Sequence, residues 1–595
     1  MPLRAAPRLR YRTVMGTVRC TTLLACALLV ATATAGVAAL PGAYDPTFNG
    51  GAPLLLDLAL TVPRVTLARG VVFDAAGRLM VTGYTSDENG RAAVFLARFG
   101  ADGVIDGTFA TGGVAIHQVG LSATPGSTGQ AIGPRSGVPG WIVAGQASAT
   151  DARTAAVALA TDANGNLDLG FGSGGSVRVQ PAGPAPQETF PNGSAVGPDG
   201  RSYTAGALQV DSTTVDLFVV AIGADGIPVA SFGNQPSAYV VSLSESTPMR
   251  TYGAGILPTS SGLLVSGATM DAVGRSELLL LRLTAAGQLD SGFAGGAGFV
   301  RLQTADPTPM TRDSGGGTIA VGPDDEIYVA GGAGDSDGRP AVALTRFTPA
   351  GVLDPTFGTG GTRRIQTAPT GQHFSSGAAG VVVQADRRIV VAGSNNDGTN
   401  GHTEGFLMRL LENGDLDPSF GTGGIASVLP EDESFPLSLA LAPDGASVIV
   451  AGISNGPPPS GTPRGLVARV LLTEVNPPPP PPPGGCAAAP SIDGARCRIA
   501  LLRAAVEAAL PDGASRRRLV SALTGADDRL AATGGLTGRK LRRKLKQAAA
   551  RIGHVRRQLG ARKLRRTLDA GTLAGLVAQA SALGDEIGAL RAGAS

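Results

Sequence analysis

One short motif, Asp-x-x-Phe, often followed by Gly, recurs along this chain at nearly constant intervals and constrains the fold more than any other feature. The copy at 416–424 reads Leu-Asp-Pro-Ser-Phe-Gly-Thr-Gly-Gly. Gaps of 61, 62, 61, 61, 64 and 63 residues separate the motif phenylalanines, which are Phe48, Phe109, Phe171, Phe232, Phe293, Phe357 and Phe420. Such regular repeats are typical of stacked units, propellers or arrays. The period therefore predicts a scaffold, and it does not by itself indicate an activity.

Each period contains the pattern of four short β-strands. In the period that spans 380–428, apolar runs at 381–383, 389–393 and 406–410 are separated by turn residues and a polar loop. The Asn413-Gly414 turn and the motif then lead to a last apolar run at 425–428. Short β-rich runs bounded by Gly, Asn, Asp and Pro indicate strands joined by turns. Four strands per period is the content of one propeller blade.

The first motif copy is displaced relative to the strands. The copy at Asp45–Phe48 precedes all the predicted strands of the first period. The final period, which ends near Leu472, has no motif of its own. We therefore expect residues 45–58 to supply the outer strand that the last period lacks, which would close a ring without free sheet edges. The sequence predicts an all-β seven-bladed β-propeller of four-stranded antiparallel blades, with an open array of repeats as the alternative.

The motif residues suit structural roles. The aspartate can cap a turn by accepting backbone N–H groups, and burial of the phenylalanine between neighbouring blades would contribute about 1.5–3 kcal/mol. The pattern resembles the delta-60 repeat family of bacterial exported proteins, and its strand order is similar to that of NHL-type propellers. Copies near Asp354 and Asp417 match well, whereas the segment 226–233 lacks the aspartate. The resemblance implies an exported propeller over 41–473, and it implies no agreed chemistry.

The first forty residues have the composition of a targeting segment. Five arginines and no acidic residue precede or flank an apolar run from Thr21 to Leu40, and small residues at 33–35 provide a cleavage site. We interpret 1–40 as a signal peptide of an exported, extracellular or cell-surface protein. An uncleaved membrane anchor, or a lipoprotein signal ending at Cys26, are the alternatives.

The end of the chain differs in composition from the body. Seven consecutive prolines, Pro477–Pro483, predict an extended linker over 474–485. Beyond it, apolar residues at helical spacing predict a basic α-helical domain of three to five helices over 486–595. Cys486 and Cys497 are the two cysteines outside the N-terminal segment, and in an exported protein they favour a disulfide over free thiols.

Charge is distributed unevenly. Residues 486–595 carry a net charge of +13 and residues 1–40 carry +5, which leaves −15 for the body out of an overall +3. The densest basic cluster is Arg539, Lys540, Arg542, Arg543, Lys544 and Lys546. This cluster suggests attachment to an anionic cell-wall polymer or membrane surface, although a solvated helix face is the simpler interpretation. It does not indicate specific nucleic-acid recognition.

Catalytic motifs are missing from the sequence. The four histidines form no metal-binding or hydrolase signature, and the repeated Gly-x-Gly strings belong to turns. Asp335 and Asp337 have a spacing that could hold calcium, but they lack the downstream glutamate of a calcium loop, which favours a solvated loop. We therefore predict no cofactor except a weak calcium candidate.

Two functions remain from these observations. The main prediction is an exported, non-catalytic propeller that serves as a binding or structural module. The alternative is an exported hydrolase or lyase, possibly calcium-dependent, whose site lies on the acidic, variable loops between second and third strands.

Overall fold

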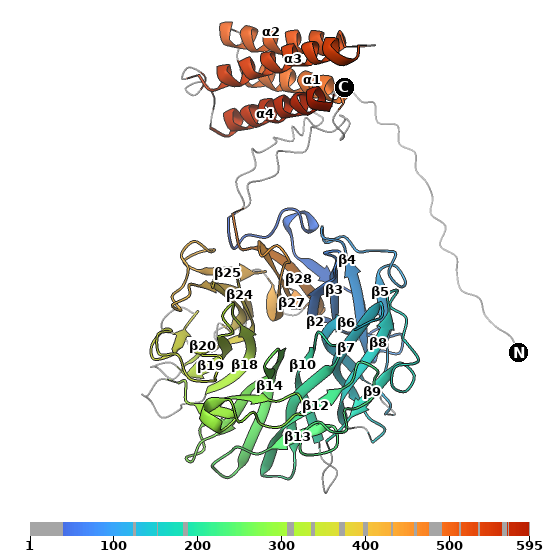
Figure 1. The fold of residues 1–595 in the computed structure, drawn as a ribbon, viewed down its shortest axis with the longest axis vertical. Helices are drawn as coiled ribbons and strands as arrows, with labels where there is room; N and C mark the ends of the chain where they lie inside the picture. The colour runs from blue at the N-terminus through green and yellow to red at the C-terminus, as the bar shows by residue number, and fades with distance from the viewer. Residues whose placement is uncertain are drawn as a thin grey trace, which may run out of the picture. The chain divides into compact units, whose positions relative to one another are not determined.

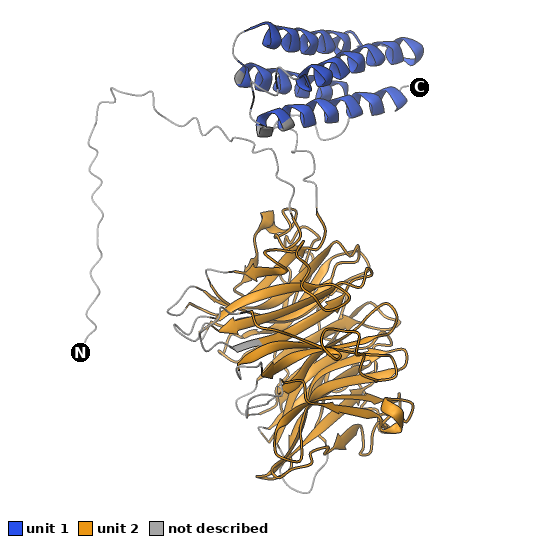
Figure 2. Cartoon of the chain, turned by 90° about the vertical axis from the view of Figure 1, so that its left-hand side faces the viewer, with its two compact units in different colours: residues 1–37, 477–595 blue, residues 38–476 orange. Residues whose placement is uncertain are grey.

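The structure is a computed structural model in which two compact units are distinguished. It describes residues 40–593 except 63, 123–125, 152, 182–187, 306–313, 335–338, 368–374, 397–402, 430–431, 457–460, 475–490, 511–512, 534–535, 562–563, 565–567 and 569. Residues 38–476 form one compact unit, here called the body, and the helices within 477–595 belong to the other, here called the helical unit. Figure 2 colours the two units separately. The predicted signal peptide and most of the predicted linker lie outside the described residues.

The body consists of β-strands that recur in groups of four, here called repeats 1 to 7. Repeats 1 and 2 contain β2 Thr66–Phe73, β3 Leu79–Ser86, β4 Ala92–Phe99, β5 Val114–His117, β6 Ser127–Pro134, β7 Gly140–Ser148, β8 Thr154–Asp162 and β9 Ser176–Val179. Repeats 3 and 4 contain β10 Glu188–Val196, β11 Ser202–Gln209, β12 Thr214–Ile222, β13 Ala238–Val241, β14 Met249–Thr259, β15 Gly262–Met270, β16 Ser276–Leu283 and β17 Phe299–Leu302.

The later repeats follow the same order. Repeats 5 and 6 contain β18 Ser314–Val321, β19 Ile327–Gly334, β20 Pro340–Phe347, β21 Thr362–Ile365, β22 Ser375–Val383, β23 Ile389–Asn396, β24 Thr403–Leu410 and β25 Ile425–Val428. Repeat 7 contains β26 Glu433–Leu441, β27 Ser447–Gly456, β28 Arg464–Leu471 and, from the start of the chain, β1 Leu54–Leu56. Two short 3₁₀ turns, η1 Asn49–Gly51 and η2 Ala294–Gly296, follow motif phenylalanines.

Within each repeat, sequential strands pair antiparallel. Five sheets have four strands each, as predicted, and the sheets of repeats 3 and 4 are joined into one of eight strands. The join is a short parallel pairing of β12 with β14, in which Thr214 lies opposite Met249 and Val215 opposite Arg250. In repeat 7, β1 pairs antiparallel with β28, with Leu54 opposite Val467. Figure 1 shows the sheets of the body arranged radially, with the first strands of the repeats toward the centre.

The hydrophobic core of the body lies between repeats. Seven clusters of buried residues each draw side chains from two neighbouring repeats, and each contains one motif phenylalanine. One cluster combines Phe48, Phe95 and Leu79 with Ile449 and Val467, so that repeat 7 packs on repeat 1. A repeat alone would leave this apolar surface exposed, and therefore neighbouring repeats stabilise each other.

Four helices are described in the helical unit, which is within the predicted range. They are α1 Ile492–Ala509, α2 Ala514–Ala531, α3 Gly538–Leu559 and α4 Ala570–Gly593. The Ser491 side chain accepts a hydrogen bond from the Gly494 N–H at 2.9 Å and caps α1. The helices share a single core that includes Leu502, Leu523 and Ile552. Among the described residues, no helix is both long and apolar enough to cross a membrane.

Candidate functional site in the central cavity

The motif residues form a structural network between repeats. In repeat 6, Asp417 Oδ1 accepts the Ser419 N–H at 3.0 Å, which caps the turn, and Asp417 Oδ2 lies 2.9 Å from Nε of Arg409. The Arg409 guanidinium lies 5.0 Å from the centre of the Phe420 ring and also donates to the carbonyl of Leu472 in repeat 7. Arg409 is fully buried, so this ion pair is shielded from water.

The same arrangement recurs where a third strand carries arginine. The arginines that lie over motif phenylalanines are Arg98, Arg282, Arg346, Arg409 and Arg469. Repeat 3 has Ala221 and Val229 in place of the arginine and the aspartate. In repeat 2, Asp168 pairs instead with Arg135 at 2.7 Å. All seven motif phenylalanines are buried, and the motif therefore serves packing between repeats rather than chemistry.

Where they are described, acidic residues in the variable loops between second and third strands accept hydrogen bonds within their own turns. Asp87 accepts the N–H groups of Asn89 and Arg91 at 2.8 and 2.9 Å and pairs with the Arg91 side chain. Burial opposes ionisation of Asp87, but these hydrogen bonds lower its pKa below the ordinary value. Asp271 holds the N–H groups of Val273 and Arg275 in the same way. These carboxylates cap their own loops, which leaves them poorly placed for catalysis.

The calcium and disulfide predictions fall largely outside the described residues. Asp335 and Asp337 are both in the gap at 335–338, and Cys486 is in the gap at 475–490. Cys497 lies in α1. Among the described residues, no group of three or more His, Cys, Asp or Glu side chains could hold a metal ion. The calcium site and the disulfide therefore stay predictions.

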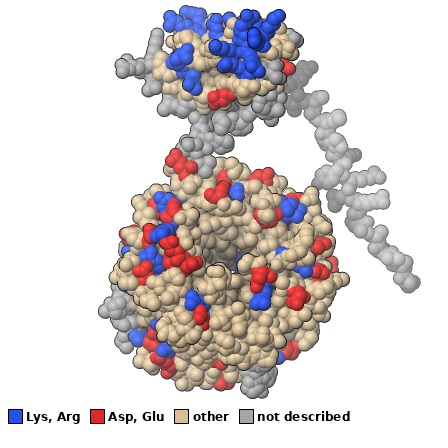
Figure 3. All heavy atoms as spheres, viewed as in Figure 1, with Lys and Arg blue, Asp and Glu red and all other residues tan. Residues whose placement is uncertain are grey.

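The predicted basic cluster lies on α3. This helix carries nine Lys or Arg residues and no acidic residue over its 22 residues. Arg539, Lys540, Arg542, Arg543 and Lys546 are exposed and Lys544 is partly exposed, while Leu545, Ala548 and Ile552 face the core. Figure 3 shows Lys and Arg gathered on the visible face of the helical unit.

A central cavity in the body is the candidate site for a ligand. Its volume is about 880 Å³, and its lining comes almost entirely from the first strands of the repeats and from the turns that follow them. In Figure 3 the body is hollowed at the centre of the visible face. The cavity lies within the range of roughly 300–1,000 Å³ that is usual for small-molecule sites.

Each first strand carries a β-bulge at the same position. The pairing of first and second strands shifts register by one residue, for example between Ala68 and Gly70 in repeat 1 and between Pro191 and Gly193 in repeat 3. A bulge re-aims the extra side chain away from the regular alternation. All seven bulge residues line the cavity, and they are Arg69, Gln130, Asn192, Ala254, Gly317, Ala379 and Leu437.

The close approach of the first strands explains a glycine beside the bulge. At Gly193, an added Cβ would lie 2.2 Å from the carbonyl oxygen of Ala254 in the next repeat. At Gly70, an added Cβ would lie 2.9 Å from the carbonyl oxygen of Gln130. The absence of side chains here lets neighbouring first strands pack closely, so that the bulge residues point into one shared space.

Polar groups occupy one side of this space. Gln130 Nε2 donates to the Pro191 carbonyl at 3.1 Å, and Asn192 Nδ2 donates to the Gly253 carbonyl at 2.9 Å, so each amide reaches to the next repeat. Ser194 Oγ donates to Gln130 Oε1 at 3.0 Å. These hydrogen bonds hold the amides in fixed orientations.

Arg69 is the single basic side chain among the described residues that line the cavity. Among the described residues it makes no ion pair, and its one recorded electrostatic partner is Tyr84. Burial lowers the pKa of the Arg69 guanidinium, and Tyr84 acts in the opposite direction. A guanidinium remains charged at neutral pH despite such a shift. The cavity therefore contains a partly buried positive charge with which no described carboxylate forms an ion pair.

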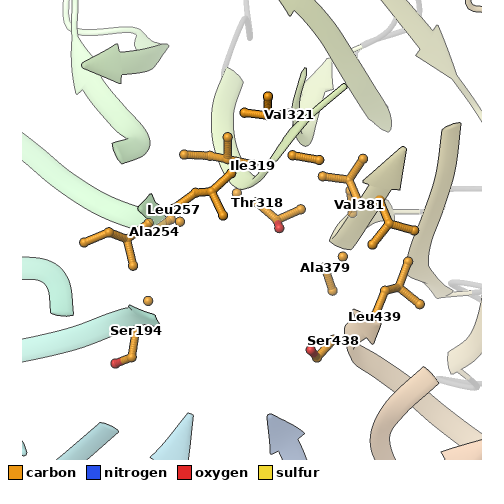
Figure 4. Close-up of a pocket in the computed structure, with 18 of the residues that line it drawn as sticks. Ser194, Ala254, Leu257, Thr318, Ile319, Val321, Ala379, Val381, Ser438 and Leu439 are labelled. Atoms are coloured by element: carbon orange, nitrogen blue, oxygen red, sulfur yellow. The ribbon is translucent and has the colours of Figure 1, made fainter. Parts of the chain in front are cut away.

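Small and apolar side chains form the other side. Figure 4 shows Leu257, Ile319, Val381 and Leu439 around the open space, together with Ala254 and Ala379 from two bulges. Asp325 is the one carboxylate in the described lining. The lining can thus bind and orient a polar group and stabilise negative charge, while it lacks a pair of carboxylates for acid–base hydrolysis.

Sequence reasoning did not find this site. The bulge position carries no motif, because its occupants differ from repeat to repeat. The only available signal was that aligned first strands have Arg, Gln and Asn at one position in repeats 1 to 3 and Ala, Gly, Ala and Leu in repeats 4 to 7. The recurring third-strand arginine was a clearer signal for the structural network, since it is lost together with the motif aspartate in repeat 3.

Comparison with known proteins supports the class of fold. The model of a family described as a domain of unknown function (DUF5122) beta-propeller matches residues 77–109, 322–357 and 384–420. Each matched segment ends at a motif phenylalanine, in repeats 1, 5 and 6. These matches are consistent with a propeller-repeat family. No curated protein matches this chain in sequence.

Solved structures with a similar fold include enzymes that act on sugars. An alpha-L-arabinofuranosidase from Fusarium graminearum is 13% identical, over 71% of this chain and 98% of its own, with a TM-score of 0.33. The polysaccharide lyase Uly1 is 9% identical over 69% and 90%, with a TM-score of 0.37. A thermostable family-43 glycoside hydrolase is 11% identical over 50% and 96%, with a TM-score of 0.26.

This finding corrects the main functional prediction. The solved structures reported above are glycoside hydrolases and a lyase rather than non-catalytic modules. At these TM-scores the likenesses carry no argument about the site or the substrate of this chain. Both are therefore argued below from its own residues.

Proposed function

We infer that the seven repeats form a closed seven-bladed β-propeller of the delta-60 type. The pairing of β1 with β28 and the core cluster shared by repeats 7 and 1 support this inference. A further support is that Arg469 of repeat 7 donates to the Ala101 carbonyl of repeat 1 at 2.9 Å. Arg282 of repeat 4 makes the same contact with the Pro349 carbonyl of repeat 5, also at 2.9 Å. Repeat 7 thus contacts repeat 1 in the same way as repeat 4 contacts repeat 5.

We propose that this protein is an exported hydrolase or lyase whose substrate enters the central cavity. Elimination by a lyase fits the described lining better than hydrolysis, because that lining holds one carboxylate rather than a pair. The observation that carries the proposal is the cavity itself, about 880 Å³ in volume and lined by the bulge residues of all seven repeats. A large concave site with a few convergent polar groups is the usual form of a substrate site. The arginine-rich, apolar N-terminal sequence supports export.

The chemistry of the lining fits a reaction in which negative charge develops on the substrate. A fixed cation in a space partly removed from water stabilises such charge more strongly than it would in bulk solvent. Arg69 supplies the cation, and the immobilised amides of Gln130 and Asn192 supply polar groups in fixed positions.

Blocking the cavity tests this proposal. The full chain is assayed on a panel of neutral and acidic polysaccharides, with reducing ends as the readout for hydrolysis and ultraviolet absorbance of unsaturated products as the readout for elimination. We expect Ala379→Trp, which places a large side chain in the cavity, to lower kcat/KM by about tenfold or more. Val273→Trp, at an exposed loop position, is the matched control and should retain activity. Equal activity of the two variants would refute the cavity as the active site.

We propose in addition that α3 attaches the protein to an anionic cell-wall polymer or membrane surface. The supporting observation is its run of nine basic and no acidic residues, with the cluster at 539–546 largely exposed. Basic side chains near an anionic lipid surface contribute about 1 kcal/mol each to binding. The attraction is screened by salt.

Sedimentation with vesicles or cell walls at increasing salt tests the attachment. We expect the full chain to bind anionic vesicles at low salt, and the variant with Arg539, Lys540, Arg542 and Arg543 changed to Gln to bind far more weakly. In the control variant, four arginines of the body are changed to Gln, so that its net charge equals that of the α3 variant. They are Arg78, Arg91, Arg153 and Arg275. Binding that is absent or independent of salt would rule out this attachment, as would equal binding by the two variants.

A further inference from the structure

The polar bulge residues lie on one side of the cavity. The three polar bulge residues, Arg69, Gln130 and Asn192, belong to consecutive repeats 1 to 3, and the four small or apolar ones belong to repeats 4 to 7. Within the repeated scaffold every bulge residue lies at an equivalent position, so the difference comes from the side chains alone. The cavity therefore has one polar, cationic sector and, from repeats 4 to 7, a mainly apolar wall, here called the apolar wall. This wall also carries the hydroxyls of Thr318 and Ser438 and the Asp325 carboxylate.

The cationic sector has the features of an oxyanion-binding site. Arg69 makes no ion pair among the described residues, and Gln130 and Asn192 each use one amide donor to bind the next repeat. A planar guanidinium binds carboxylate and sulfate groups through two parallel hydrogen bonds. An anionic ligand group would supply the counter-ion that none of the described residues provides.

The remainder of the cavity limits what carries the anion. A single arginine offers one positive charge, which suits one negative charge per bound unit rather than a polyphosphate. Leu257, Ile319 and Val381 on the apolar wall offer contact to C–H surfaces and no hydrogen bonds. A sugar ring with one acidic substituent has both kinds of surface, hydroxyls and an anion at its edge and C–H groups on its faces.

We propose that the central cavity binds an acidic sugar unit of a glycan, with Arg69 as the counter-ion of its carboxylate or sulfate ester. Gln130 and Asn192 are positioning residues that hold the polar sector in place, and the apolar wall contacts the face of the ring. The inference rests on the proposed function, because it assigns a substrate class to the same cavity. It goes further in requiring that the substrate be anionic.

Binding of matched oligosaccharides to the full chain tests the inference. Calorimetry is carried out with an oligogalacturonate, with its neutral methyl ester, and with a sulfated neutral oligosaccharide of the same length. We expect the acid or the sulfated form to bind and the methyl ester to bind at least tenfold more weakly. The two anionic arms show whether the carboxylate or the sulfate ester is the natural group.

Variants at Arg69 show whether it provides the counter-ion. Arg69→Gln should weaken binding of the anionic form by about 10- to 100-fold and leave binding of the methyl ester unchanged, while Arg69→Lys should retain part of the affinity. Arg64→Gln, at an exposed arginine paired with Asp57, removes the same charge from the surface and should change nothing. Native circular dichroism and an unchanged unfolding midpoint show that each variant is folded.

The outcomes separate the two proposals. Equal binding of acid and ester, or no effect of Arg69→Gln, would overturn the acidic-sugar inference and leave the cavity available as a neutral substrate site. Catalysis that survives Ala379→Trp unchanged would overturn the cavity as the active site, whatever the result at Arg69. Loss of anion binding in Arg69→Gln with the ester unaffected would support both proposals.

Discussion

At the scale of single residues, the body depends on contacts that join one repeat to the next. The turn glycine between third and fourth strands is an example. Gly351 has a φ of +78°, and a Cβ at this position would lie 2.4 Å from Cζ of Phe293 in the preceding repeat. Gly360, also at positive φ, has no atom within 4 Å of the position where a Cβ would lie. The positive φ angle favours glycine at both positions. At Gly351 the close packing of Phe293 also excludes a side chain, whereas Gly360 has no such neighbour.

Alanine at these two glycines should therefore have different effects on stability. Gly360→Ala should cost about 1 kcal/mol for the left-handed backbone alone. Gly351→Ala should cost a further 1–3 kcal/mol, because the Phe293 ring has to move. Urea unfolding followed by tryptophan fluorescence and circular dichroism measures both. Equal losses of stability would show that the contact with Phe293 is unimportant.

The motif aspartates make the stability of the body dependent on pH. Hydrogen bonds from the Thr108 hydroxyl and N–H, with a contribution from Arg98, lower the pKa of Asp106 from 3.8 to about 2. Because the folded-state pKa is depressed, the stabilisation is complete above about pH 4 and is lost as the pH falls through about 2. Asp106→Asn should therefore lower stability at neutral pH, and the difference from the unmodified chain should shrink between pH 4 and pH 2. A difference that stays constant over this range would contradict this account.

At the scale of elements, the third strand and the motif loop are joined by the arginine–aspartate pair. In repeat 6 the pair is almost completely buried, and Arg409 extends the contact to the Leu472 carbonyl of repeat 7. Repeat 3 folds with Ala221 and Val229 at the two positions. The fold therefore tolerates loss of both partners. Loss of Asp417 alone would leave the buried Arg409 without its counter-ion, whereas loss of Arg409 alone would leave Asp417 with Arg388, whose Nε lies 3.3 Å from Oδ2.

A double-mutant cycle in repeat 6 tests this interpretation. Asp417→Val should destabilise the body by about 3–5 kcal/mol, and Arg409→Ala should cost less, because Arg388 still pairs with Asp417. The double variant, which reproduces the composition of repeat 3, should lose less than the sum of the two by about 1–3 kcal/mol. The exposed pair of Arg153 and Asp151 serves as the control, for which coupling below about 1 kcal/mol is expected. Strict additivity at Arg409 and Asp417 would show that the pair is not coupled.

At the scale of the whole molecule, the ends of the body meet in repeat 7. Tyr44 Oη accepts the Leu429 N–H at 3.0 Å, the Asp45 N–H donates to the Arg469 carbonyl at 2.9 Å, and β1 pairs with β28. Without this N-terminal segment, β28 would become an edge strand with unpaired backbone groups. The inferred ring thus depends on pairing between β28 and a segment about four hundred residues earlier in the chain.

Removal of the closing segment should loosen the body near repeats 7 and 1. In a variant without residues 1–58, we expect faster amide hydrogen exchange in β28, β2 and β3 and increased self-association, while β15 and β16 keep their protection. A variant without residues 1–40 alone is the control and should exchange like the full chain. Unchanged protection of β28 in the longer deletion would contradict ring closure.

The sequence alone sufficed for the repeat architecture, because a motif of fixed spacing and short β-rich runs depend on local pattern. It also sufficed for the helical C-terminal region, where the periodicity of apolar residues is strong. Blade number and closure follow from the same counting and stay inferences. The bulge residues could not be found in this way, since a bulge is defined by the register between two strands and leaves no periodic trace.

Only the tertiary structure decided which side chains meet. Arg69, Gln130 and Asn192 are about sixty residues apart from one to the next, and they share a cavity because their strands stand side by side around one centre. The Asp-x-x-Phe motif is a second example. The third-strand arginine reaches the motif aspartate and phenylalanine only once the repeat has folded. Local pattern determines which elements form, whereas the packing of those elements determines which residues act together.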